Sequence, residues 1–504
     1  QYLKELIYRQ FMSSNPKKTT HSLELPYRFA KEKGVIFDRI ENKIVYIKSN
    51  NLSSLSTFSE LRNFYQLPVF VTPVKNNLFE KELAKHYSEN ATSSADLIDD
   101  MDDSYDLSAL VANIPKTADL LDSENDAPVI KLINAFIAEA IKGRASDIHI
   151  EPYEEYLSVR FRVDGMLKEV LKPNSKLTSM LNARIKIMSN LDIAEKRIPQ
   201  DGRMSLRLGE KWIDIRVSTL PSSYGERIVL RILDKADSHL TLEQLGMKDE
   251  LLHEFKNSLK NPNGIILVTG PTGSGKTTSL YAGLNLLNDS SRNIITVEDP
   301  VEYAIDGVSQ TQVNTKVGMT FGKGLRAILR QDPDIIMVGE IRDLETAEIA
   351  IQASLTGHLV LSSVHTNNAS SAITRMKDMG IESYLLASTV KGILAQRLVR
   401  KLCVTCKEEY VSKTDIHGIP LGSKLFRPSG CSVCNETGYS GRIGVFEFLS
   451  INDELKEAIN NDSSEENISN IAFKHQNNLV QSGAELVTEG LTSVDELMRV
   501  TKEQ

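Results

Sequence analysis

The sequence has 504 residues, of which 41% are hydrophobic and 25% are charged, with a formal net charge of −8. This length predicts about three globular domains, and the acidic balance gives no support to a dedicated nucleic-acid binder, which usually carries a basic face. No apolar run reaches the roughly 20 residues that cross a bilayer, and no signal-peptide pattern is present. We therefore expect a cytoplasmic protein that reaches a membrane only through partners. The first residue is Gln1, which leaves open a truncated or engineered start.

The first 90 residues predict a small α/β module. Its expected elements are strands at 43–48 and 69–72 and helices at 53–65 and 77–86. Residues 91–126 are acidic and poor in apolar side chains, a composition that is typical of a solvated linker. We therefore place a domain boundary in that stretch.

Residues 127–235 predict a second α+β module. Its expected elements are a helix at 128–141 and strands at 147–150, 157–163, 213–217 and 227–232. The dipeptide Asp164-Gly165 follows an alternating run and indicates a β-hairpin turn. A short linker, 236–245, ends this part of the chain.

Residues 246–400 alternate short apolar strands with helical stretches, which predicts a parallel, buried sheet covered by helices. The expected strands are 265–269, 294–297, 335–338 and 359–363. A cysteine-containing segment, 401–445, and a helical, amphipathic tail, 446–504, complete the chain. The predicted class is therefore a multidomain α/β protein.

A phosphate-binding loop follows the first strand of this region, and a helix follows the loop. Its glycines let backbone N–H groups turn toward phosphate oxygens, and the helix adds its positive N-terminal end. Lys276 is expected to reach the β- and γ-phosphates and Thr277 to ligate Mg²⁺, so the loop predicts ATP binding. The loop residues are Gly270, Pro271, Thr272, Gly273, Ser274, Gly275, Lys276, Thr277 and Thr278.

Three of the later apolar strands end in groups that nucleotide hydrolysis needs. Glu298 and Asp299 end the strand at 294–297, Glu340 follows the strand at 335–338, and His365 follows the strand at 359–363. Ligands gather at the carboxyl ends of strands in open α/β sheets, so these groups are expected to share one crevice with the loop. Glu340 is our first choice for polarising the attacking water and Glu298 our second. His365 is the candidate sensor of the γ-phosphate.

The four cysteines of the chain form two Cys-x2-Cys pairs separated by 24 residues. Each pair can hold one edge of a tetrahedral Zn²⁺, although the spacing exceeds the 15–20 residues of many zinc ribbons. Four protein ligands leave no open coordination position, so the predicted site is structural. The cysteines are Cys403, Cys406, Cys431 and Cys434.

With these motifs in place, the chain resembles the type II secretion ATPases, the general secretion pathway protein E family. The likeness covers 127–504 closely and includes a tetracysteine subdomain, and a weaker likeness extends to Leu25–Phe37 in the family's first domain. Within the motor region, the segments that carry it are the phosphate loop, Ile295–Tyr303, Ile328–Asp343 and Thr356–Asn367. The resemblance implies a RecA-like P-loop motor domain.

The resemblance also implies an assembly and a role. The family forms homo-hexamers at the cytoplasmic side of the inner membrane, where ATP hydrolysis powers pseudopilus assembly and protein export. Its first domain docks on the cytoplasmic part of secretion protein L, and the platform protein F is a second partner. Arginines of its second module approach the phosphates, a role carried here to Arg216 and Arg231.

Three other functions remain open. A type IV pilus-extension ATPase shares the motor, the cysteines and an N-terminal extension, whereas retraction motors resemble only the core. A nucleic-acid-translocating hexamer is opposed by the low isoelectric point and the lack of a basic and aromatic strip. A scaffold with a degenerate site is opposed by the presence of Lys276, Thr277 and Glu340.

Overall fold

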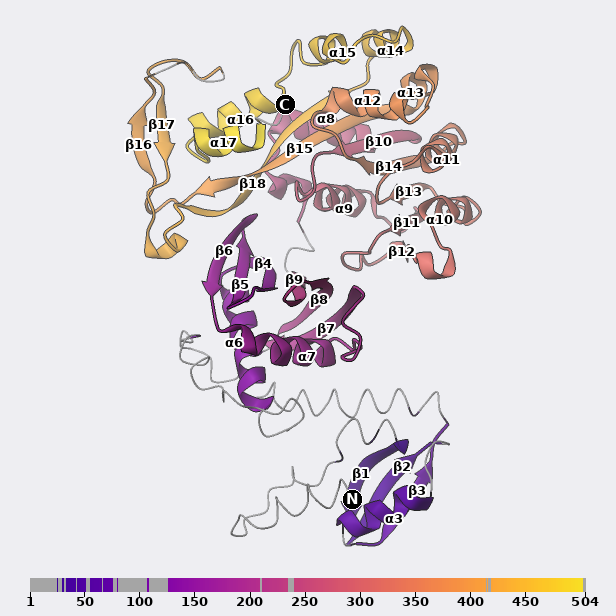
Figure 1. Cartoon of the computed structure of the whole chain (residues 1–504). Coiled ribbons are helices and arrows are strands. Elements are labelled where there is room, and N and C mark those ends of the chain that lie inside the picture. Colours follow the sequence, from indigo (N-terminus) through magenta and orange to yellow (C-terminus); the bar gives the residue numbers. More distant parts are fainter. Residues whose placement is uncertain are drawn as a thin grey trace. The chain divides into compact units, whose positions relative to one another are not determined.

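The computed structural model of the chain has two compact units, one formed by 1–163 and 167–233 and the other by 164–166 and 234–504. Figure 1 labels their elements along the chain. The helix expected at 77–86, apart from Phe79, and most of the acidic linker lie outside the described residues. The structure describes residues 25, 30, 33–41, 43–50, 55–65, 67–75, 79, 107, 126–208, 211–233, 240–413, 415 and 418–501.

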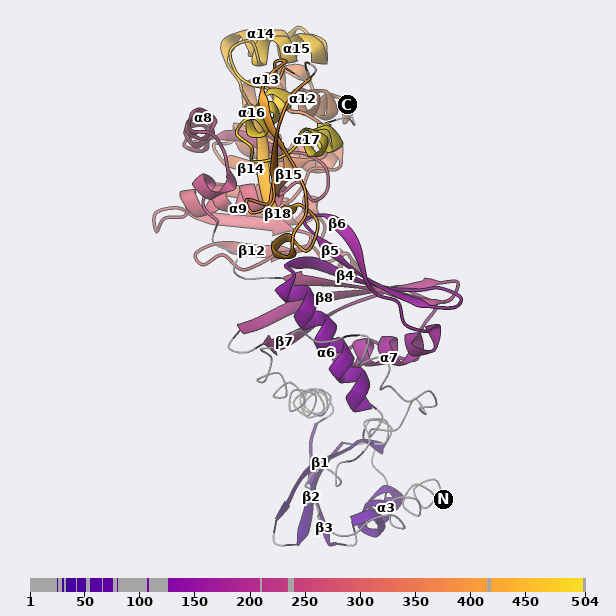
Figure 2. The ribbon, with the colours of Figure 1, turned by 90° about the vertical axis from the view of Figure 1, so that its left-hand side faces the viewer.

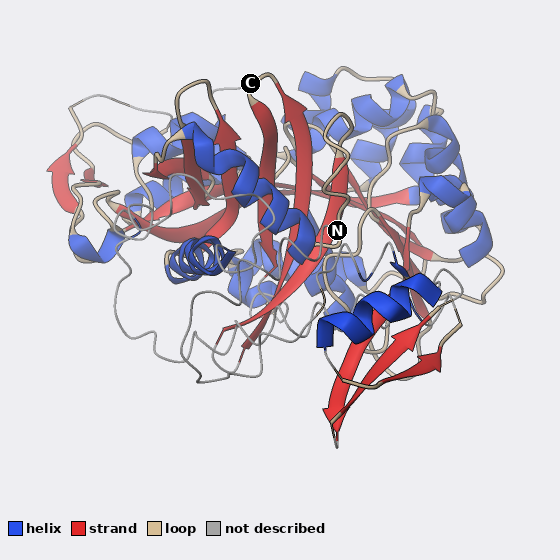
Figure 3. Ribbon diagram, turned by 60° about the horizontal axis from the view of Figure 1, so that its bottom comes forward, coloured by secondary structure: helices blue, strands red, loops and turns tan. Residues whose placement is uncertain are grey.

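The N-terminal module is a three-stranded sheet with one described helix against it. Strand β2 pairs with β1 in antiparallel and with β3 in parallel orientation. Helix α3 packs Leu61 and Tyr65 on Val35, Val45 and Ile47, and Figure 3 shows it lying against the sheet. The elements are β1 (Val35–Glu41), β2 (Ile44–Ser49), α3 (Leu55–Tyr65) and β3 (Val69–Pro73), which confirms the expected strands and first helix.

The second module is a six-stranded sheet in the order β6-β5-β4-β9-β8-β7 with two helices packed on it. Asp164 and Gly165, between β5 and β6, have φ values of 48° and 85°, the two positive angles that a tight type I′ hairpin needs. The predicted hairpin is therefore confirmed. The elements are α6 (Asp126–Lys142), β4 (Ala145–Pro152), β5 (Leu157–Val163), β6 (Met166–Leu171), α7 (Thr178–Met188), β7 (Gln200–Leu208), β8 (Lys211–Ser222) and β9 (Gly225–Leu233).

The motor region is built on a seven-stranded sheet in the order β12-β11-β13-β14-β10-β15-β18. Every neighbouring pair is parallel except β15 with β18, so the predicted parallel sheet is confirmed with an antiparallel edge added. The strands are β10 (Gly264–Thr269), β11 (Ile294–Glu298), β12 (Ser309–Gln312), β13 (Ile335–Val338), β14 (Leu359–Val364), β15 (Val390–Leu402) and β18 (Tyr439–Ser450).

Helices cover both faces of this sheet, which explains why interior strands such as β10 and β13 carry apolar residues at consecutive rather than alternate positions. In β10, Ile265 and Leu267 pack into one buried cluster, whereas Ile266 and Val268 pack into another. Figure 2 shows α8 and α12 on opposite sides of the strands. The helices are α8 (Asp249–Leu259), α9 (Lys276–Leu287), α10 (Phe321–Ile328), α11 (Leu344–Leu355), α12 (Ala369–Asp378) and α13 (Ser383–Thr389).

The cysteine-containing segment is inserted between two neighbouring strands of the motor sheet. It leaves the sheet at the end of β15 and returns through β18, so the predicted division at residue 445 lies inside a strand. Its hairpin of β16 (Glu408–Val411) and β17 (Lys424–Arg427) packs Leu425 on Val487 and Leu497 of the tail. The predicted helical tail consists of α14 (Asp453–Asn460), α15 (Glu465–Ala472), α16 (Leu479–Thr488) and α17 (Val494–Thr501).

Among the described residues, no helix combines the length and the apolar character that a bilayer crossing requires.

Candidate nucleotide site and metal centre

The phosphate-binding loop joins β10, an interior strand of the motor sheet between β14 and β15, to α9. Gly270 has a φ of 149°, and a Cβ there would lie 2.5 Å from the carbonyl oxygen of Gln396 on β15. Gly275, with a φ of 89°, is the N-cap of α9. Both positions therefore need glycine, because L-residues rarely adopt these angles and the first has no room for a side chain.

Lys276, the first residue of α9, lies folded into the loop. Its Nζ donates hydrogen bonds to the carbonyl oxygens of Gly270, at 2.8 Å, and Pro271, at 3.1 Å. The pKa of Lys276 is lowered to about 8, mainly by burial and to a smaller extent by the Arg397 guanidinium, against the opposing effect of the Glu340 carboxylate. Thr277, the next residue, is exposed, so its hydroxyl is accessible as a ligand for a cation.

Glu340 follows β13, the second neighbour of β10 in the sheet. It is 9% exposed, and its carboxylate forms an ion pair with Arg342 and lies beside His365, with 3.4 Å between Oε2 and Nε2. The peptide before it is fixed because Gly339 N–H donates to Val297 O at 2.8 Å and Ser363 Oγ donates to Gly339 O at 2.8 Å. The structure thus fixes the Glu340 carboxylate beside the Arg342 guanidinium and the His365 imidazole.

His365 lies at the end of β14, between β13 and β10. Its side chain is 48% exposed, and burial followed by the charge of Lys276 lowers its pKa, against the Glu340 carboxylate. The loop that carries it is tied to β10, since Thr366 N–H donates to Thr269 Oγ1 at 3.0 Å. Lys276, Glu340 and His365 therefore act on one another electrostatically at one edge of the sheet, as the strand-end pattern predicts.

Glu298, the last residue of β11, has a different environment. It is 2% exposed, and its carboxylate accepts hydrogen bonds from the hydroxyl of Tyr281 on α9, from Thr296 Oγ1 at 2.5 Å and from Gln310 Nε2 at 3.1 Å. These donors tie β11 and β12 to the helix that follows the phosphate loop. This environment favours Glu340 over Glu298 as the group that meets water.

Arg216 and Arg231 lie in the second module, in one row across its sheet. Arg203 on β7 is opposite Arg216 on β8, which is opposite Arg231 on β9, and Arg231 is opposite Asp147 on β4. The Arg231 guanidinium donates to Asp147 Oδ1 at 2.9 Å. The structure therefore places Arg216 and Arg231 opposite each other on neighbouring strands, with Arg231 held by Asp147.

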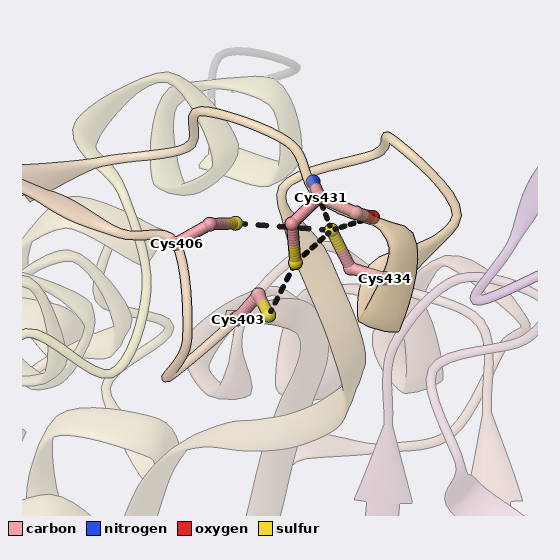
Figure 4. Close-up of side chains that lie close together, drawn as sticks. All are labelled: Cys403, Cys406, Cys431 and Cys434. Carbon is pink, nitrogen blue, oxygen red and sulfur yellow. Dashed lines mark hydrogen bonds between the residues drawn. The ribbon is translucent and has the colours of Figure 1, made fainter.

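The four cysteines form one cluster, shown in Figure 4, with all Sγ atoms within 4.8 Å of one another. The Sγ atoms of Cys403 and Cys431 are 3.9 Å apart, those of Cys406 and Cys434 3.8 Å, and those of Cys431 and Cys434 3.7 Å. A Zn–S bond of about 2.3 Å in a tetrahedral site gives an S–S edge of about 3.8 Å. The cluster therefore has the dimensions of a four-thiolate zinc site.

Backbone N–H groups support these sulfurs. Gly438 N–H and Cys431 N–H each donate to Cys434 Sγ at 3.2 Å, and Gly430 N–H donates to Cys406 Sγ at 3.4 Å. Burial raises the pKa of the Cys434 thiol, but the N–H groups of Cys431 and Gly438, together with the Cys431 and Cys406 sulfurs, outweigh it and bring the pKa down to about 6. At Cys434 this support favours the thiolate, the form that binds metal.

Sequence reasoning missed three residues at the nucleotide site. Arg342 pairs with Glu340, and Gln396 and Arg397 approach the phosphate loop from β15. The sequence feature that could have identified Arg342 is its position two residues after Glu340. No motif marks β15, because its role depends on a strand order that places it next to β10.

A phosphate-binding loop after a central parallel strand, with an acid at a nearby strand end, defines the class of P-loop nucleotide hydrolases. The chain belongs within that class to the type II secretion ATPase family: residues 122–499 match the family described as Type II/IV secretion system protein. Residues 24–87 match a family model of the N-terminal domain of GSPII protein E. The resemblance seen in the sequence is thereby confirmed.

Relatives of known name match almost the whole chain. It is 50% identical to Type II secretion system protein E of Pseudomonas aeruginosa over 485 residues, covering 95% of this chain and 96% of that protein. It is 49% identical to Type II secretion system ATPase E of Vibrio cholerae over 503 residues, covering 98% of this chain and 99% of that protein.

Solved structures share the fold. The ATPase DotB of Legionella pneumophila aligns with a TM-score of 0.56 at 20% identity, covering 74% of this chain and 96% of that one. The pilus retraction motor PilT, solved with bound ADP, aligns with a TM-score of 0.51 at 28% identity, covering 73% and 97%. Both likenesses leave about a quarter of this chain unmatched, which agrees with a shared ATPase core carrying additional segments here.

Proposed function

We propose that the chain is an ATP-hydrolysing motor that works as a homo-hexamer at the cytoplasmic side of the inner membrane. It powers pseudopilus assembly and protein export by type II secretion. The observation that carries this proposal is the meeting of Lys276, Glu340 and His365 beside the phosphate loop. The names of the relatives in Pseudomonas aeruginosa and Vibrio cholerae support the choice of pathway.

The chemistry follows from what each side chain can do. The loop amides and the Lys276 ammonium hold the β- and γ-phosphates, and the exposed hydroxyl of Thr277 offers a ligand for Mg²⁺. When bound, Mg²⁺ neutralises charge on the phosphates. Glu340 orients and polarises the attacking water, and His365, half exposed beside it, detects whether the γ-phosphate is present.

Domain closure would complete the site. In the proposal, Arg216 and Arg231 of the second module approach the phosphates and stabilise the charge that develops on the transferred group. Their positions support this role, because residues opposite each other on neighbouring strands can reach one anion together. Hydrolysis and the movement of the second module are then coupled.

Zinc has a structural role in this account. The four cysteines would hold one Zn²⁺ and thereby fix the turns that flank β16 and β17. This small segment has a core of only a few apolar residues shared with α16 and α17. A structural metal adds folding free energy that such a small core does not supply.

The remaining partners follow from the family. Residues of the N-terminal module would dock on the cytoplasmic domain of secretion protein L, and the hexamer would act on the platform protein F, so that the chain meets the membrane only through partners. The test is ATPase activity of the full chain with and without the cytoplasmic domain of protein L, together with solution mass. Stimulation by that domain and a hexameric mass are expected; no ATPase activity in either condition would contradict the proposal.

A type IV pilus-extension ATPase is the second candidate, because the ATPase core is shared with a pilus motor, the retraction motor PilT, and an extension motor would also have the cysteines and an N-terminal extension. Complementation separates the two functions. The proposal expects the gene to restore export in a strain that lacks its secretion ATPase, and to leave piliation unrestored in a strain that lacks its extension ATPase. The opposite result would establish the pilus function.

A further inference from the structure

A buried glutamine on β15 lies directly against the phosphate loop. Strand β15 runs parallel to β10, and their last paired residues are Thr269 and Ala395. Gln396 is therefore the next residue along β15 at the point where β10 gives way to the loop. It is 2% exposed, so the surrounding chain fixes its position.

The Gln396 side chain binds the loop backbone. Its Nε2 donates a hydrogen bond of 2.6 Å to the carbonyl oxygen of Ser274. A Cβ at Gly275 would lie 3.0 Å from the same Nε2, and a Cβ at Gly270 would lie 2.5 Å from the Gln396 carbonyl oxygen. Two loop glycines thus make room for this one residue.

The hydrogen bond from Gln396 to Ser274 O fixes the orientation of the Ser274–Gly275 peptide, and phosphate binding depends on that orientation. In a trans peptide the C=O of one residue and the N–H of the next point in opposite directions. Holding Ser274 O against Gln396 therefore directs Gly275 N–H to the other side and keeps a carbonyl dipole from pointing at phosphate oxygens. Lys276 holds Gly270 O in a similar way.

A role in packing alone does not explain this residue. In the part of the chain that the structure describes, Gln396 Oε1 is buried without a hydrogen-bond partner. Such a group is unfavourable because its desolvation is not compensated, whereas an apolar residue of similar volume would avoid that penalty. The amide is therefore best explained by its Nε2 donor group, which binds the Ser274 carbonyl oxygen of the loop.

We infer that Gln396 is a positioning residue: by holding Ser274 O it presets the phosphate loop for nucleotide. This inference rests on the proposed ATPase function. It concerns a strand outside the nucleotide motifs, and the residue acts through the loop rather than by touching the nucleotide.

The test compares Gln396→Met, which keeps the volume but removes the donor, with Leu394→Met, a buried residue two positions earlier that faces the same side of the strand. The measurement is the melting temperature of the full chain without nucleotide and with MgADP. A ligand that binds only the folded state raises this temperature according to its affinity. We expect Gln396→Met to bind MgADP about tenfold more weakly and to show a clearly smaller rise at the same MgADP concentration, while Leu394→Met keeps the full rise.

The outcomes separate the two proposals. No rise in the unaltered protein would contradict the ATPase function itself. A full rise in Gln396→Met, with or without a lower starting temperature, would overturn the positioning role, because a purely structural residue changes the starting temperature alone. Gln396→Asn keeps an amide but shortens its reach by one methylene group; it replaces the methionine variant if that variant does not fold, and the same loss is expected.

Discussion

Glu340 and His365 approach each other from the ends of neighbouring strands, with 3.4 Å between Oε2 of the carboxylate and Nε2 of the imidazole. Strands β13 and β14 pair in parallel, so their carboxyl ends meet at one edge of the sheet. The charge of Lys276 acts on both side chains from the phosphate loop. Three residues that are far apart in the sequence thus form one electrostatic unit at the proposed nucleotide site.

Glu298 gives the first prediction. Glu298→Gln should lower the stability of the motor region by about 2 kcal/mol, because the carboxylate accepts from three donors and an amide would turn its own N–H groups toward them. Thermal unfolding of the variant measures the loss. Glu348→Gln, on the exposed surface of α11, is the matched control. An unchanged melting temperature with lost turnover would instead make Glu298 catalytic.

The lowered pKa of Lys276 leads to the prediction that nucleotide binding is accompanied by proton uptake. With a pKa of about 8 in the free protein, the amine is largely neutral at pH 8.5, and bound phosphate raises the pKa and recharges it. Binding of MgADP should therefore take up about 0.7 proton per site at pH 8.5 and about 0.1 at pH 7.0. Affinity falls as the pH rises through 8.

Calorimetry in buffers of different ionisation enthalpy measures this uptake. The value at pH 7.0 is an internal control on the same protein. No proton uptake at either pH would show that Lys276 is already fully charged before the nucleotide binds.

The sequence was sufficient for the parts of this site that depend on local chain order. The phosphate loop, the strands that precede Glu340 and His365 and the Asp164-Gly165 turn each carry a pattern within a few residues, and the structure has the loop and strands where they were expected. The continuous apolar runs of the motor strands also follow from local composition, since helices cover both faces of the sheet.

Strands β15 and β18 were not predicted, and neither was the role of Gln396. The 13 residues of β15 mix buried apolar positions with Gln396 and Arg397, whose polar groups are buried because they bind loops from distant parts of the chain. Such contacts depend on strand order. The environment of Glu298 could not be predicted from the sequence for the same reason. Its hydrogen-bond donor Tyr281 lies on α9, and no local sequence pattern shows how that helix packs against β11.

The cysteine cluster predicts one zinc ion per chain. Purified protein should contain about one molar equivalent of zinc, and Cys434→Ser should lose it and unfold the segment between β15 and β18 at lower temperature. Ser432→Ala, in the same turn, is the control and should keep the metal. Elemental analysis beside limited proteolysis measures both effects. A folded, protease-resistant segment without metal would contradict the zinc site.

The most direct test of the account is turnover and nucleotide affinity of Glu340→Gln measured side by side. The carboxylate is placed to act on water, and the loop and Lys276 are placed to hold the phosphates. We expect ATP hydrolysis to fall by about 100-fold or more while the affinity for MgADP changes less than about threefold. Unchanged hydrolysis in this variant would contradict the role of Glu340 and with it the proposed mechanism.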